Sequence, residues 1–170
     1  MKYRTLGKTG LKVSEVGCGT WQLANDPNAW VGSDLNESLK SLERFVELGG
    51  NFIDTAWIYG YDDSKPSKHP SEELIGKLLK KSSKRDKLII ATKVPPKNMH
   101  WPALKGVHIS EVFPNDWIIK CVDDSLRSLG VDVIDLVQFH VWQDAFADED
   151  EWKETIQKIM KSGTLKYWGI

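Results

Sequence analysis

The feature that most constrains the fold is a regular alternation of short apolar runs with longer amphipathic segments. The apolar runs are nearly continuous, as is typical of strands that are covered on both faces. They are "EVGCGT", "NFID", "KLIIAT", "VIDLVQF" and "LKYWGI". An amphipathic segment separates each run from the next. This order predicts an α/β fold, in which four strand–helix units and a fifth strand form a parallel sheet.

The amphipathic segments carry helix signals at their ends. In the segment 33–48, one helical face consists of Leu35, Leu39, Leu42 and Val46. Ser33 or Asp34 can cap the start of this helix, and the glycines at 49 and 50 can end it. The other predicted helices are 71–81, 114–130 and 149–163. Residues 1–14 precede this alternation of strands and helices. Their Gly-Lys-Thr-Gly centre predicts a small β-hairpin.

Length and composition narrow the class of protein. The chain of 170 residues is long enough to bury one sizeable core, so we expect a single domain over 1–170. The net charge is -1, with both signs spread along the chain, and this argues against a nucleic-acid partner. No apolar run is long enough to cross a membrane, and the first residues lack the apolar stretch of a signal peptide. We therefore expect a cytoplasmic protein without a membrane or nucleic-acid partner.

Metal and dinucleotide motifs are not supported by the spacing. Cys18 and Cys121 have no metal or redox spacing, and they are expected to be reduced thiols in apolar surroundings. The four histidines also lack ligand spacing, so no metal site is expected. "GCGTWQ" begins like a GxGxxG motif but has Gln22 where the third glycine belongs.

Ionisable residues stand at the carboxyl ends of three consecutive predicted strands. Asp54, Lys93 and His140 end or directly follow the second, third and fourth of these strands, and Tyr59 comes shortly after Asp54. Taken singly, each has an ordinary explanation as a turn residue, a solvated cation or a satisfied histidine near the core. Because neighbouring parallel strands end at the same edge, the side chains can meet. In β/α barrels this edge is where catalytic residues lie.

The chemistry of these four side chains suggests proton transfer to an oxygen. A phenol is a weak acid at neutral pH, and a neighbouring ammonium favours the release of its proton. A carboxylate beside a buried lysine keeps the lysine charged. Tyr59, Lys93 and Asp54 would thus be acid, cation and anchor. His140 can hydrogen-bond to a substrate carbonyl oxygen.

Two long connections also follow strand ends, at 94–113 and 141–150. Loops of this length in a compact domain are usually functional or disordered. Their tryptophans, Trp101 and Trp142, are expected to shape a substrate pocket.

At these residues the sequence resembles the aldo-keto reductase family. The resemblance covers essentially the whole chain, and its motifs come in the family's order. They are "VGCGTW", "NFIDTAWIYG", "IIATKV", "SLRSLGVDVIDLVQFH" and "IQKIMKSGTLKYWGI". The resemblance implies a (β/α)8 TIM barrel that reduces aldehyde and ketone carbonyls with a reduced nicotinamide, usually NADPH.

The resemblance also implies roles for individual residues. Asp54, Tyr59, Lys93 and His140 fall on the family's catalytic positions, with Tyr59 as the general acid. Gly19, Thr20, Trp21 and Asp54 fall on or near cofactor-binding positions. Trp21 also matches a position that lines the substrate or nicotinamide pocket, although packing at the barrel mouth would explain it equally well.

The sequence covers only part of the family's barrel, and this limits what is expected of its cofactor binding. The family has eight strand–helix units, and this sequence reaches its fifth strand at Ile170. We therefore expect an N-terminal half-barrel that lacks most of the cofactor site, so NADPH binding by this chain alone is expected to be poor. The chain would be a fragment of a longer enzyme, a half completed by a second copy through exposed sheet edges, or a partial gene product. The alternative function is a non-catalytic half-barrel that self-associates or serves as a binding scaffold.

Overall fold

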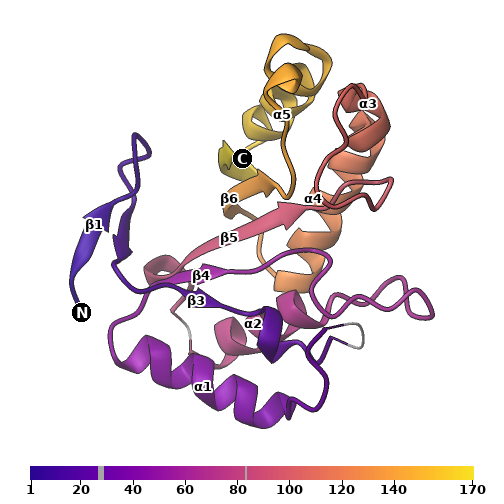
Figure 1. Cartoon of the computed structure of the whole chain (residues 1–170). Helices are drawn as coiled ribbons and strands as arrows, with labels where there is room; N and C mark the ends of the chain where they lie inside the picture. The colour runs from indigo at the N-terminus through magenta and orange to yellow at the C-terminus, as the bar shows by residue number, and fades with distance from the viewer. Residues whose placement is uncertain (27–28, 83) are drawn as a thin grey trace.

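A five-stranded parallel sheet forms the centre of the molecule (Figure 1). The structure is a computed structural model that describes residues 1–26, 29–82 and 84–170. The strands neighbour one another in chain order, which confirms the predicted α/β class with a parallel sheet. They are β3 (Cys18–Gly19), β4 (Phe52–Asp54), β5 (Ile89–Val94), β6 (Ile134–Phe139) and β7 (Leu165–Gly169).

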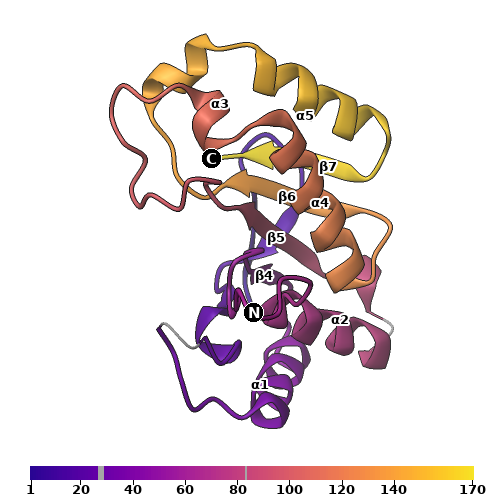
Figure 2. The same cartoon turned by 90° about the vertical axis from the view of Figure 1, so that its right-hand side faces the viewer.

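The helices connect these strands and lie along one side of the curved sheet (Figures 1 and 2). Successive long helices pack against one another, in the order α1, α2, α4, α5. The α-helices are α1 (Leu35–Glu47), α2 (Pro70–Ser82), α3 (Ile109–Val112), α4 (Asn115–Leu129) and α5 (Glu151–Lys161). Short 3-10 helices are η1 (Trp21–Leu23), η2 (Arg85–Lys87) and η3 (Asp144–Asp148). The four long helices therefore lie where the sequence pattern predicts them.

Local signals explain the helix ends. Asp34, one of the two predicted caps of α1, accepts hydrogen bonds from the backbone N–H groups of Asn36 and Glu37. Helix α4 ends at Gly130, which adopts a left-handed conformation (φ 66°) that glycine takes without strain. The Gly130 N–H group donates to carbonyls of the last turn, so the helix closes on itself.

The predicted hairpin is also present. β1 (Tyr3–Thr5) and β2 (Lys12–Ser14) pair antiparallel and form a separate two-stranded sheet. The Tyr167 hydroxyl, on β7, donates to the carbonyl of Thr9 in the hairpin turn (2.5 Å). The Tyr3 hydroxyl donates to the carbonyl of Gly49, after α1. The hairpin thus links the last strand of the sheet to the first helix.

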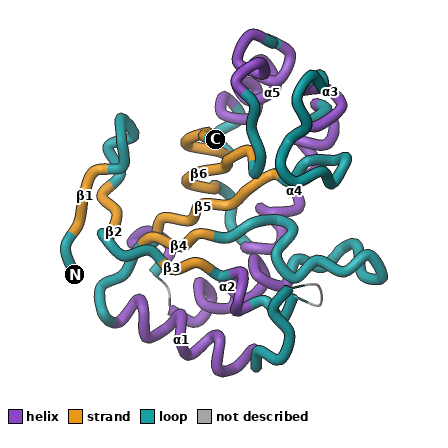
Figure 3. The backbone as a smooth tube through the Cα atoms, in the orientation of Figure 1, coloured by secondary structure: helices purple, strands orange, loops and turns teal. Residues whose placement is uncertain are grey.

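The core lies between the sheet and its helices. Ile53, Ile90 and Val137 from the strands are buried there against residues such as Leu74 and Ile118 from the helices. The two long connections are not structureless, because the first contains α3 and the second contains η3. In Figure 3 the first connection leaves the carboxyl end of β5, and the second leaves the carboxyl end of β6. These are the strand ends where the sequence places the candidate site.

Candidate active site

The ammonium group of Lys93 is the centre of the site. Its Nζ donates to Asp54 Oδ1 at 2.6 Å and to the Thr55 carbonyl oxygen at 2.8 Å. A third contact, to the Tyr59 hydroxyl, is 3.3 Å long. An ammonium has three protons, so these three acceptors account for all of its donor capacity. The side chain of Lys93 is 14% exposed and that of Asp54 37%, so the ion pair lies at the floor of an open site.

Strand register brings these groups together. Asp54 lies opposite Ala91 across β4 and β5, and Lys93 is two residues further along β5. Because side chains alternate between the faces of a sheet, Lys93 shares a face with Ala91 and thus with Asp54. The long lysine side chain spans the remaining offset. Tyr59 reaches the same point from the turn after β4, where its N–H group bonds to the Ala56 carbonyl.

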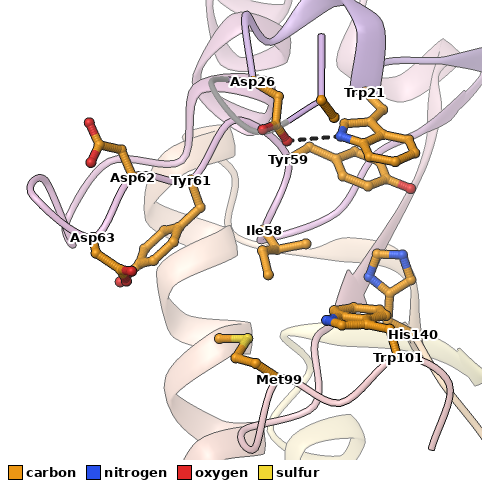
Figure 4. Close-up of a pocket in the computed structure, with 11 residues that line it drawn as sticks. Trp21, Asp26, Ile58, Tyr59, Tyr61, Asp62, Asp63, Met99, Trp101 and His140 are labelled. Atoms are coloured by element: carbon orange, nitrogen blue, oxygen red, sulfur yellow. Dashed lines mark hydrogen bonds between the residues drawn. The ribbon is translucent and has the colours of Figure 1, made fainter.

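His140 approaches Tyr59 from the next strand end. It follows β6 directly, and its N–H group donates to the Val94 carbonyl at 3.0 Å. Its ring meets that of Tyr59 edge-on, with centroids 5.6 Å apart, and lies 4.7 Å from the ring of Trp101 (Figure 4). Burial, and secondly the charge of Lys93, lower the pKa of His140 to about 4. The imidazole is therefore neutral at pH 7.

An aromatic pocket opens above these groups, with a volume of about 930 Å³. The Trp21 indole stacks on the Tyr59 ring, with centroids 5.6 Å apart and planes inclined by 15°. Asp26 holds this indole by accepting from its Nε1 at 2.9 Å (Figure 4). The other residues that line the pocket are Ala29, Ile58, Tyr61, Asp62, Asp63, Met99, Trp101 and His140. The arrangement can hold a flat or apolar molecule over the Tyr59 hydroxyl.

The predicted pocket and cofactor residues lie in different places. Trp21 and Trp101 line the pocket, whereas Trp142 packs against Phe139, Phe146 and Trp152 beside the core.

Of the predicted cofactor residues, Gly19 is exposed next to Asp54. Thr20 is fully buried, and its hydroxyl bonds to the Asp54 carbonyl and to Ser71 rather than facing the pocket.

Three residues in or near the site were not predicted from the sequence. Asp26 orients Trp21, Thr55 supplies a carbonyl to Lys93, and Ser71 bonds to both Thr20 and Thr55. Thr55 directly follows Asp54 at the end of β4, so its place at a strand end was a signal in the sequence that could have identified it. Asp26 and Ser71 lie in a loop and at a helix start, where polar residues are common and carry no particular signal.

Other site types find no support in the part of the chain that the structure describes. Within it, no group of three or more His, Cys, Asp or Glu residues could hold a metal ion. No described helix has the length and apolar character needed to cross a membrane. Both cysteines are free, and burial raises the pKa of the Cys18 thiol, which disfavours its reactive form.

The aldo/keto reductase family model matches residues 15–170. The chain belongs to the aldo/keto reductase family. This membership agrees with the strand-end position of Asp54, Tyr59, Lys93 and His140, and it confirms the resemblance seen in the sequence.

Individual relatives agree in both sequence and fold. The chain is 31% identical to the aldo-keto reductase YhdN of Bacillus subtilis over 170 residues, which cover 100% of this chain and 46% of YhdN. It is 33% identical to 6-dehydroglucose reductase of Novosphingobium aromaticivorans, over 99% of this chain and 50% of that protein. The holo form of the aldo-keto reductase AKR11C1 from Bacillus halodurans superposes with a TM-score of 0.72 at 31% identity, over 100% of this chain and 50% of that one.

The chain thus spans about half the length of the aldo/keto reductases that it matches. The sheet and helices correspond to part of the (β/α)8 barrel of these proteins, which confirms the predicted fold class. The matching part includes Asp54, Tyr59, Lys93 and His140.

Proposed function

We propose that this chain carries the proton-donating part of an NAD(P)H-dependent reductase of aldehyde or ketone carbonyls. The observation that supports this most directly is the Lys93 ammonium, held by Asp54 within 3.3 Å of the Tyr59 hydroxyl. Membership of the aldo/keto reductase family supports the reaction class. The interpretation of 1–170 as one domain, the cytoplasmic location and the absence of nucleic-acid partners stay predictions.

In the proposed mechanism, the substrate oxygen lies between the Tyr59 hydroxyl and the neutral imidazole of His140. A reduced nicotinamide, when bound, supplies the hydride to the carbonyl carbon. Tyr59 gives its proton to the oxygen, so that the carbonyl becomes an alcohol. The ammonium of Lys93 stabilises the phenolate that remains, and Asp54 keeps that ammonium charged. His140 orients the carbonyl oxygen by donating a hydrogen bond from the N–H group of its neutral imidazole.

The residues present fit one end of a nicotinamide cofactor. Gly19 borders open space, since a Cβ built on it would meet no atom within 4 Å. Trp21 offers a flat, partly exposed ring beside it, and the Asp54 carboxylate is accessible. We propose that Gly19, Trp21 and Asp54 contact the nicotinamide end, and that Thr20 supports this contact indirectly, because its N–H group and its hydroxyl bond to the Asp54 carbonyl. NADPH is the proposed cofactor, and titrating the chain with NADPH while following nicotinamide fluorescence tests its binding.

Replacing the proposed acid tests the function. Tyr59→Phe is expected to lower NADPH-dependent reduction of a small aldehyde by at least about a hundredfold, because the proton donor is lost. The ring and its stacking on Trp21 remain, so NADPH binding is expected to stay unchanged. Tyr61→Phe is the matched control, since Tyr61 lines the pocket but, unlike Tyr59, does not bond to Lys93. Full activity in Tyr59→Phe would rule out the assigned acid, and no turnover with any carbonyl in the unchanged chain would rule out the activity for this chain alone.

A further inference from the structure

The hydroxyl of Ser71 lies at the centre of a buried cluster beneath the site. Ser71 belongs to the first turn of α2, and its Oγ is 2.6 Å from Thr20 Oγ1 and 2.8 Å from Thr55 Oγ1. All three residues have no exposed surface. Thr20 follows β3 and Thr55 follows β4, so one helix residue joins two neighbouring strand ends. We refer to Thr20, Thr55 and Ser71 as the hydroxyl cluster.

The number of protons available decides which hydroxyl of the cluster donates and which accepts. Each hydroxyl has one proton to donate. The Thr20 hydroxyl donates to the Asp54 carbonyl oxygen at 3.1 Å, so its short contact with Ser71 uses the proton of Ser71. The Thr20 carbonyl oxygen, 3.4 Å away, is a second acceptor for the same Ser71 proton, so Ser71 accepts from Thr55. The hydrogen bonds therefore run from Thr55 through Ser71 and Thr20 to the backbone of Asp54.

The same cluster fixes the peptide that holds Lys93. Thr55 is bound on three sides: its N–H group donates to the Ala91 carbonyl at 2.8 Å, its hydroxyl bonds to Ser71, and its carbonyl accepts from Lys93 Nζ. The Thr55 carbonyl is one of only three acceptors around that ammonium among the described residues. The Ser71 hydroxyl does not bond to Lys93 or to the Asp54 side chain, but the Ser71 N–H group donates to the carbonyl oxygen of Tyr59 at 3.4 Å. Ser71→Ala keeps this backbone bond, so any effect of losing the Ser71 hydroxyl passes through Thr55 or Thr20.

We propose that Ser71 is a positioning residue, whose hydroxyl holds Thr55 so that the Thr55 carbonyl keeps the Lys93 ammonium within reach of Asp54 and Tyr59. This inference rests on the proposed role of Lys93. The alternative explanation is that Ser71, at the start of α2, only completes the packing of this helix. That explanation predicts a loss of stability but no specific change at Lys93.

The environment of the Lys93 ammonium distinguishes the two explanations and requires no turnover. In the full chain labelled with ¹⁵N-lysine, NMR measures how fast the Lys93 ammonium protons exchange with water, and a Lys93→Met variant assigns the signal. Ser71→Ala is expected to speed this exchange by about tenfold, because the Thr55 carbonyl is no longer held in place. Ser125→Ala is the matched control, because this serine is also buried but lies on α4 and does not bond to Thr55. An unchanged Lys93 signal in folded Ser71→Ala, or an equal change in Ser125→Ala, would overturn the proposal.

A second variant covers the case in which Ser71→Ala does not fold. Thr55→Val has nearly the same shape but removes the first hydroxyl of the cluster, and it is expected to speed Lys93 exchange to a similar extent. An unaltered exchange rate in Thr55→Val would equally overturn the proposal. Because exchange is measured without substrate, a failure of carbonyl reduction in the unchanged chain would count against the proposed function and not against this inference.

Discussion

His140 shows how a single residue takes its chemistry from its surroundings. An exposed histidine changes charge near pH 6.5. Here burial is the larger cause and the Lys93 charge the smaller one, and together they lower the pKa to about 4. Its Nδ1 is buried and has no hydrogen-bond partner within the described ranges. A neutral ring suits the proposed orienting role better than a second acid would.

The ionisation of His140 can be tested directly. In NMR titrations its ring is expected to stay neutral from pH 8 down to about pH 5. Lys93→Met removes the smaller of the two causes, so it is expected to raise the pKa of His140 while leaving it below its ordinary value. Lys161→Met, which removes a charge at the exposed end of α5, is the control. A His140 titration near pH 6.5 in the unchanged chain would contradict the assignment.

This ionisation also has a consequence for stability. The unfolded chain takes up the His140 proton as the pH falls below about 6.5, whereas the folded chain does so only near pH 4. The contribution of His140 to the free energy of unfolding is therefore present above pH 6.5 and decreases as the pH falls towards 4.

At the scale of elements, the packing of α2 against α4 and β5 encloses a carboxyl group. Glu72 is fully buried, and its Oε1 accepts from the Thr92 hydroxyl at 2.7 Å. Helix α2 approaches α4 closely at Gly76, where a Cβ would lie 2.8 Å from the Ser128 carbonyl oxygen. No water-accessible space remains around the carboxyl group, and burial raises the pKa of Glu72 to about 7.

The burial of Glu72 predicts that stability depends on pH. The unfolded chain loses this proton near pH 4.5 but the folded chain keeps it to about pH 7, so the free energy of unfolding decreases as the pH rises between these values. The decrease is at most about 3 kcal/mol. Glu72→Gln removes this dependence, and it is expected to raise the urea midpoint at pH 8 relative to the unchanged chain much more than at pH 5.

Glu73→Gln is the matched control, because it removes a carboxylate on the more exposed side of the same helix. If Glu72→Gln shifted the urea midpoint equally at both pH values, the buried carboxyl group would not be the source of the pH dependence.

At the scale of the whole molecule, the sheet has two edges, β3 and β7. β6 bonds to alternate residues of β7, since the Ile134 N–H group donates to the Thr164 carbonyl and Ile134 pairs with Leu165. The N–H group of Tyr167 therefore points to the open side. Unpaired backbone groups of this kind favour pairing with another chain. Self-association of a non-catalytic half-barrel, the alternative function expected from the sequence, stays a proposal, and these backbone groups provide a place to test it.

Sedimentation over a wide concentration range tests this. We expect a dimer that forms with increasing concentration and that Tyr167→Pro weakens, because proline removes the outward N–H group. Tyr167→Phe is the matched control: it loses the hydroxyl bond to Thr9 but keeps the N–H group. A monomer at every concentration in the unchanged chain would argue against pairing through β7.

The sequence by itself determined the order and type of the elements and the candidate active-site edge. Apolar runs and helix caps such as Asp34 and Gly130 are local signals, and parallel strands must end at a common edge. Asp54, Tyr59, Lys93 and His140 were thus expected to lie together, and the structure places them together.

Only the tertiary structure decided how these groups are held. It placed Trp21 on Tyr59 and Trp142 beside the core, and it turned the Thr20 hydroxyl away from the pocket towards Ser71. These positions depend on contacts between residues far apart in the chain, such as Ser71 with Thr20. The alternation of apolar and polar residues records which face of an element is buried, but it does not record which partner meets that face.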